Sequence, residues 1–273
     1  MRVVMPLFQF QYVDSEEFIF SDGQLSLRHF TDAKNVSHRE IFSKRDRMYI
    51  GQARYAVVAE SGVLKEEKYH QDVNLLLMTF RILGDGVTPM IKYRLSDNDD
   101  LCARLDGTEN RILLPGYLFE VYSVAAFPRI DKAYMMLRDA ERISPRLKNA
   151  LFFLYKAFYS VHWIDAFLFC MNALEALFSL DKEGPATKTI CNRTSALLDD
   201  PANWDEATIK DLYRTRSHIT HGRIVASPDP NDNLRLSEKM ERVTKLCFRK
   251  LIELDAFHHF ENPASRDSFL GSL

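Results

Sequence analysis

The sequence predicts an α+β protein in two parts: a mixed α+β domain over residues 1–128 and an all-α helical bundle over residues 129–273. Through residue 127, short apolar runs mostly alternate with polar residues and are separated by turn residues, which is typical of strands. After Pro128, apolar residues recur at helical spacing to the end of the chain. The 46% of apolar and 27% of charged residues are the proportions of an ordinary globular protein.

Strands dominate the prediction for the first part. The first is expected over residues 3–13, which are rich in aromatic and β-branched side chains. A tight hairpin should follow, because Ser21-Asp22-Gly23-Gln24 separates the apolar runs 18–20 and 25–27. Further strands are predicted at residues 48–59, 87–95 and 117–126.

One helix is expected to interrupt these strands. Five apolar residues recur at helical spacing, and Gly84 after them supplies a stop. They are Val73, Leu76, Leu77, Phe80 and Leu83.

Six helices are predicted in the second part, after an expected boundary at residues 128–131. The first covers residues 131–142. Ser144 and Pro145 then begin the second helix, as its N-cap and its first helical residue. The remaining four are expected at residues 163–180, 186–198, 205–221 and 234–260.

Charge and cysteine content narrow the class of protein. The chain has 36 basic and 38 acidic residues, which argues against a surface covered in positive charge but leaves room for a local basic groove. The four cysteines, Cys102, Cys170, Cys191 and Cys247, form no CxxC pair. We therefore expect no disulfide framework and no cysteine zinc site. No other metal site and no cofactor are expected, since the sequence has no phosphate loop and no GxGxxG motif.

A cytoplasmic location is expected, without contact with a membrane. The N-terminal residues lack the long apolar region of a signal peptide. The most apolar stretch, residues 151–180, is interrupted by Lys156, Asp165 and Glu175, and so falls short of the ~20 apolar residues of a membrane span.

Glu175 is the most unusual residue of the third predicted helix. It lies on the same side as Leu168, Met171 and Phe178, in an otherwise apolar stripe. A buried carboxylate needs a cationic or hydrogen-bonding partner, for which Arg216 and Arg193 are the candidates. The alternative is that Glu175 lies at the edge of the stripe and reaches water.

The fifth predicted helix ends in a cluster of basic residues. Three arginines and two histidines occur between Arg214 and Arg223. Arg216 and His221 point about 140° apart on an ideal helix, so spacing alone does not join them in one site. A second helix or subunit must close the site, or the helix must deform near Gly222. The plain alternative is that both residues are solvated near the helix C-terminus.

Three segments carry a resemblance to a known family. They read Asp165-Ala-Phe-Leu-Phe-Cys-Met-Asn-Ala-Leu-Glu175-Ala-Leu-Phe178, then Arg193-Thr-Ser-Ala-Leu-Leu198, then Ile209-Lys-Asp-Leu-Tyr213-Arg-Thr-Arg216-Ser-His-Ile-Thr-His221-Gly222. In this order they resemble the HEPN superfamily, and within it the Apea-like branch of abortive-infection proteins.

The resemblance implies a helical domain that forms a homodimer, in which two Arg-x4–6-His segments line one cleft. In active members this cleft is a metal-independent endoribonuclease of a defence or stress system. Arg216 and His221 match the catalytic arginine and histidine, while Glu175 and Ser217 match supporting positions. The strongest toxins have Asn, Asp or His where this chain has Ser217.

Four neighbouring residues are further candidates for contact with RNA: Tyr213, Arg214, His218 and Arg223. Packing and solvated surface are equally good explanations for each of them. Two other functions stay open for the cluster as a whole. One is a dimeric HEPN module that binds RNA, a nucleotide or another anion without cleaving it, and the other is a purely structural network of buried charges.

Overall fold

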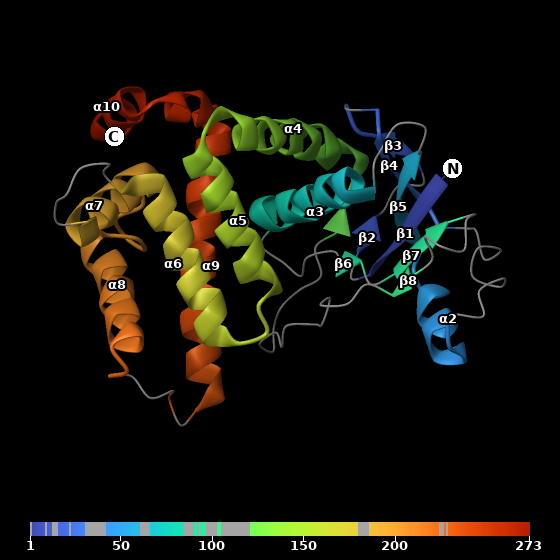
Figure 1. The fold of residues 1–273 in the computed structure, drawn as a ribbon, viewed down its shortest axis with the longest axis horizontal. Helices are drawn as coiled ribbons and strands as arrows, with labels where there is room; N and C mark the ends of the chain where they lie inside the picture. Colours follow the sequence, from blue (N-terminus) through green and yellow to red (C-terminus); the bar gives the residue numbers. More distant parts are fainter. Residues whose placement is uncertain are drawn as a thin grey trace. The chain divides into compact units, whose positions relative to one another are not determined.

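The structure, a computed structural model, describes residues 2–8, 10–12, 16–21, 23–30, 42–60, 66–84, 90–91, 93–96, 103–104, 121–179, 186–223, 227 and 229–273. The chain forms two compact units (Figure 1). The first, here called the sheet unit, comprises Met1–Glu109 and Gly116–Met135, and the second, the helical unit, comprises Asn110–Pro115 and Met136–Leu273. The expected order of a mixed α+β part followed by a helical part is confirmed, and the sheet of the first part is antiparallel.

Seven strands form the main sheet: β1 (Arg2–Phe8), β3 (Phe18–Ile19), β4 (Leu25–His29), β5 (Tyr55–Glu60), β6 (Met90–Ile91), β7 (Tyr93–Ser96) and β8 (Ala103–Arg104). Their order is β3-β4-β5-β1-β7-β8, with β6 also paired to β1, and every pairing is antiparallel. Two short strands, β2 (Gln11–Tyr12) and β9 (Val121–Tyr122), pair in parallel beside it.

The predicted hairpin is present as β3 and β4, where Phe18 pairs with Leu27. Gly23 has a φ of 65°, which an Asp-Gly turn supplies at little cost. The predicted strand at residues 48–59 is wrong in its first part. Residues 48–50 end the helix α2 (Lys44–Ile50). Ser43 precedes this helix, and its Oγ accepts from the Asp46 N–H at 3.1 Å, as an N-cap side chain does.

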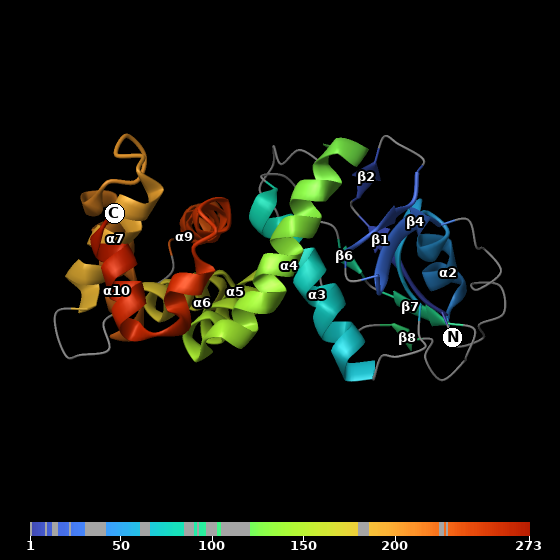
Figure 2. The same ribbon diagram turned by 90° about the horizontal axis from the view of Figure 1, so that it is seen from above.

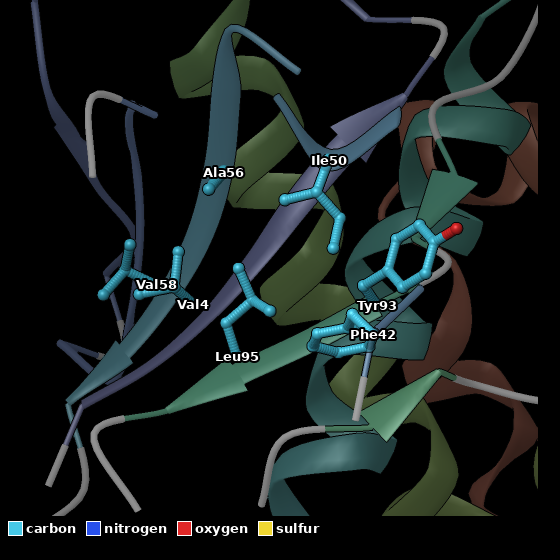
Figure 3. Close-up of a cluster of buried hydrophobic side chains, with 7 residues drawn as sticks. All are labelled: Val4, Phe42, Ile50, Ala56, Val58, Tyr93 and Leu95. Carbon is cyan, nitrogen blue, oxygen red and sulfur yellow. The ribbon is translucent and has the colours of Figure 1, made fainter. Parts of the chain in front are cut away.

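One face of the sheet packs against α2 through a cluster of seven buried apolar residues (Figure 3). The cluster consists of Val4, Phe42, Ile50, Ala56, Val58, Tyr93 and Leu95. Val4 pairs with both Val58 and Leu95, so the three side chains share this face of the sheet. The Tyr93 hydroxyl donates to Asp46 Oδ1 at 2.8 Å, which satisfies the one polar group of the cluster.

The helix α3 (Glu66–Leu83) covers the opposite face of the sheet (Figure 2). The helix predicted from the apolar residues at positions 73–83 is confirmed, and it begins earlier, at Glu66. Its Phe80 ring contacts Phe10, Tyr122 and Phe127, with ring centroids 5.9, 5.1 and 6.4 Å away. Phe127 begins the helix α4 (Phe127–Ile143), after a short 3-10 turn, η2 (Val124–Ala126). These aromatic contacts explain why the division between the units falls within α4, beyond the expected boundary.

The helical unit contains the rest of α4 and six further α-helices: α5 (Pro145–Tyr159), α6 (Trp163–Phe178), α7 (Ala186–Leu198), α8 (Glu206–Thr220), α9 (Pro230–Glu253) and α10 (Pro263–Gly271). A 3-10 turn, η3 (Phe257–Glu261), precedes α10. The apolar helix α6 is central, because it packs against α5, α7, α8 and α9. The predicted cap of α5 is confirmed, since Ser144 Oγ accepts from the Leu147 N–H at 3.2 Å.

The last predicted helix, residues 234–260, is wrong in its second part. The helix α9 ends at Glu253, and Asp255 adopts a φ of 51°. The N–H groups of Asp255 and Ala256 donate back to Ile252 and Leu251, which closes the helix in the same way as a glycine would. The sequence analysis missed α10, although Asn262 followed by Pro263 is an ordinary helix start and Asn262 Oδ1 accepts from the Ser265 N–H at 2.8 Å.

Candidate functional site

A charged pair links α6 to α8 inside the helical unit. The Nη2 of Arg216 lies 3.3 Å from Oε1 and 3.4 Å from Oε2 of Glu175. The two side chains are about one third exposed, at 35% for Arg216 and 30% for Glu175. The structure therefore contains the predicted pair, at the rim of the helix interface and not in its core. Both contacts use one nitrogen, so the described residues leave the other N–H donors of the guanidinium available to a further anion.

Tyr213 lies one turn before Arg216 on α8 and is buried, with only 4% of its surface exposed. Burial raises the pKa of Tyr213, and the neighbouring carboxylate of Glu175 raises it further. The hydroxyl therefore stays protonated. A ring without an open face cannot stack on a nucleotide, so we assign Tyr213 to packing and not to contact with RNA.

The two ends of α8 are set by local signals. At its start, Asp205 is the N-cap, and its Oδ1 accepts from the Thr208 N–H at 2.8 Å. At its end, Gly222 has a φ of 65° and its N–H donates to the Ile219 carbonyl at 3.0 Å, while the Arg223 N–H donates to the His218 carbonyl at 2.8 Å. These two bonds form a Schellman motif, which ends the helix.

His221 is the C-cap residue of this motif, and its side chain is exposed. The His-Gly pair therefore has a local structural role, because Gly222 ends the helix and leaves His221 at its tip. Arg216 precedes His221 by five residues, about 7.5 Å along an ideal helix axis. Among the described residues, no contact joins the side chains of Arg216 and His221 within one copy of the chain.

The other candidates lie around this tip. Arg214 and Arg223 are exposed, while Ser217 and His218 are partly buried. Arg214 Nη1 lies 3.4 Å from Asp211 Oδ1 in an exposed pair one turn apart. The solvent side of the last turns of α8 is thus mainly basic.

Arg193, the other predicted partner of Glu175, is engaged elsewhere. Its Nη1 donates to the Phe178 carbonyl at 3.0 Å and lies 3.3 Å from Asp267 Oδ1. The buried Arg266 binds the same oxygen at 3.0 Å. The sequence analysis missed this α7–α10 contact because it did not predict α10, and Asp267 lies far from Arg193 along the chain.

Neither a metal-binding cluster nor a membrane-spanning helix is found in the part of the chain that the structure describes. Among those residues, no group of three or more His, Cys, Asp or Glu side chains is placed to hold a metal ion. The helices in the same part of the chain include none that is long and apolar enough to cross a membrane.

Comparison of the chain with protein-family models, curated proteins and solved structures found no match. The geometry of the helical unit is therefore the basis for assigning a function.

Proposed function

We propose that this protein is a metal-independent endoribonuclease of the HEPN type, in which Arg216 binds the scissile phosphate and His221 transfers a proton. One observation carries this proposal. The Glu175 carboxylate holds the Arg216 side chain about one third exposed on α8, ahead of a histidine that the helix end presents to solvent. An arginine and a histidine, which together can support metal-free cleavage of RNA, are therefore both accessible to solvent on the same helix.

The chemistry proceeds by attack of a ribose 2′-hydroxyl on the adjacent phosphorus. His221 accepts the hydroxyl proton, because histidine is the side chain that most often serves as a general base. Arg216 holds the non-bridging phosphate oxygens and stabilises the negative charge of the transition state. The bond between phosphorus and the 5′-oxygen breaks, and the leaving oxygen takes up a proton from water. The products carry a 2′,3′-cyclic phosphate and a 5′-hydroxyl.

A second copy of the chain completes the site in this proposal. Arg216 and His221 diverge by about 140° around α8, so a two-fold axis beside α8 is the simplest way to bring an arginine and a histidine to one phosphate. We therefore expect a homodimer through the helical unit. Light scattering at tens of micromolar protein should give the mass of a dimer.

The second candidate function is binding of RNA or another anion without cleavage. The Glu175–Arg216 pair favours this alternative, because a neighbouring carboxylate already offsets part of the positive charge that would stabilise a transition state. Ser217, in place of the residues found in the strongest toxins, points in the same direction.

Incubation of the purified protein with a labelled single-stranded RNA in EDTA tests the proposal. Wild-type protein should cleave the RNA, and both Arg216→Ala and His221→Ala should abolish cleavage. The double variant should be little worse than either single one, since residues that act on one phosphate are non-additive. The matched controls are His162→Ala, an exposed histidine at the start of α6, and Arg235→Ala, an exposed arginine of α9.

The outcomes separate the candidate functions. If the wild type and both control variants cleave RNA but Arg216→Ala and His221→Ala do not, the result supports the ribonuclease. Intact RNA that nevertheless binds, with binding lost in Arg216→Ala and His221→Ala, supports the binding module. RNA that is neither bound nor cleaved by a confirmed dimer leaves the cluster with a structural role.

A further inference from the structure

The solvent face of α5 is both aromatic and basic. The helix contains Arg146, Lys148 and Lys156 but no Asp or Glu. Phe152 is 51% exposed, although a large apolar ring is ordinarily buried. Lys148 and Lys156 are exposed on the same helix, and the Lys156 Nζ lies 5.5 Å from the centroid of the Phe152 ring.

The aromatic surface continues from α5 onto α6. Phe152 contacts Phe153 edge-on at 5.6 Å between ring centroids. Phe153 in turn stacks on Phe169 of α6, with centroids 6.4 Å apart and ring planes at 23°. Phe153 and Phe169 are both partly exposed. We call Phe152, Phe153, Phe169, Lys148 and Lys156 the aromatic–basic face.

We infer that the aromatic–basic face binds a single strand of nucleic acid, and that under the proposed function, on which this choice rests, the strand is the RNA substrate. Bases of a single strand expose faces that stack on aromatic rings, and the neighbouring lysines attract the phosphates. Figure 1 shows α6 between α5 and α8. The aromatic–basic face, on α5 and α6, and Arg216, on α8, therefore lie on helices that pack together through α6.

The charges favour a polyanion over a second copy of the chain. A two-fold contact of this face with itself would bring Lys148 and Lys156 of one copy toward those of the other. No carboxylate on α5 opposes them, and like charges across an interface are unfavourable. On α6, Glu175 is already paired with Arg216, and Asp165 is the exposed acidic residue.

Fluorescence anisotropy of a labelled 2′-O-methyl oligonucleotide tests the inference, since this probe lacks the attacking hydroxyl and stays intact. Phe152→Ala should weaken binding by roughly five- to a hundredfold, the effect of one lost base stack. Lys156→Gln should reduce the slope of log affinity against log salt by about 0.7. The matched control is Lys239→Gln, because Lys239 lies 6.0 Å from the centroid of Trp204, whose ring is buried and offers no stacking face.

Binding measurements with two other nucleic acids identify the kind of ligand. Duplex RNA should bind with an affinity that Phe152→Ala leaves unchanged, because its bases stack within the helix. A single-stranded DNA of the same sequence is the second comparison. If Phe152→Ala weakens DNA binding as much as RNA binding, the face is a general single-strand site. If it weakens DNA binding less, the face is selective for RNA.

Unchanged single-strand binding by Phe152→Ala, at an unchanged melting temperature, would overturn the inference. Dissociation of a dimer by Phe152→Ala without any loss of RNA affinity would also overturn it, and would identify a second copy as the occupant. Phe152-dependent binding by a protein that never cleaves RNA would leave this inference standing and refute the ribonuclease. If Phe152→Ala changes neither cleavage nor binding, the ribonuclease stands and this inference is refuted.

Discussion

The carboxylate of Glu175 on α6 contacts Arg216 on α8 through a single guanidinium nitrogen, at 3.3 and 3.4 Å from its two oxygens. This contact explains how a carboxylate is tolerated on α6, the most apolar of the described helices. It also holds the arginine in one place while leaving about a third of its side chain open to solvent. The same pair thus serves helix packing and the proposed site.

Removing this carboxylate should destabilise the protein moderately. We expect Glu175→Ala to lower the free energy of unfolding by about 1–2 kcal/mol, between the values typical of exposed and of buried pairs. Urea denaturation measures the difference. The control is Asp211→Ala, whose pair with Arg214 is exposed and should contribute less than about 1 kcal/mol. Equal stability of wild type and Glu175→Ala would show that the pair contributes nothing.

Gly222→Ala should destabilise the end of α8. The φ of 65° at Gly222 is unfavourable for a residue with a Cβ, although the space around it is open. We expect a loss of about 1 kcal/mol in the free energy of unfolding. Gly271→Ala is the matched control, because Gly271 ends α10 in open space without a positive φ. A similar small effect of both substitutions would argue against strain at Gly222.

The cap of α8 should make stability depend on pH. Hydrogen bonds from the Thr208 side chain, and then from its backbone N–H, lower the pKa of Asp205 below its ordinary value. The stabilisation is therefore complete above the ordinary pKa of about 3.9 and is lost as the pH falls through the lowered value.

Asp205→Asn tests this dependence, because asparagine caps a helix equally well but does not titrate. Wild type should lose more stability than the variant as the pH is lowered from 5 to 2. Parallel pH profiles of the two proteins in urea denaturation would contradict the prediction.

Cys191 should react slowly with alkylating reagents in the folded protein. Burial, followed by the nearby carboxylate of Glu206, raises the pKa of Cys191 to about 11. Roughly one thiol in a thousand is then ionised at pH 8, and the thiolate is the reactive form. Peptide mapping by mass spectrometry after iodoacetamide treatment should find Cys191 unlabelled until urea is added. Rapid labelling of the folded protein would show that α7 opens readily.

The sequence by itself determined the features that depend on a few neighbouring residues. The hairpin at Gly23, the cap at Ser144, and α8 from Asp205 to Gly222 were all predictable. Each is set by backbone conformation or by a hydrogen bond within four residues, so the distant chain has little influence on it. The Ser43–Asp46 contact at the start of α2 is also local, and a serine three residues before an acidic residue is a sequence signal for a helix start.

Only the tertiary structure decided which side chains meet across helices. It paired Glu175 with Arg216 and directed Arg193 to Asp267, although both arginines were open candidates from the sequence. It also buried Tyr213, for which the sequence left packing, solvated surface and contact with RNA all open. Periodicity predicts one apolar side for each helix, but the burial of a residue depends on how many neighbouring helices cover it. That number is set by packing around α6.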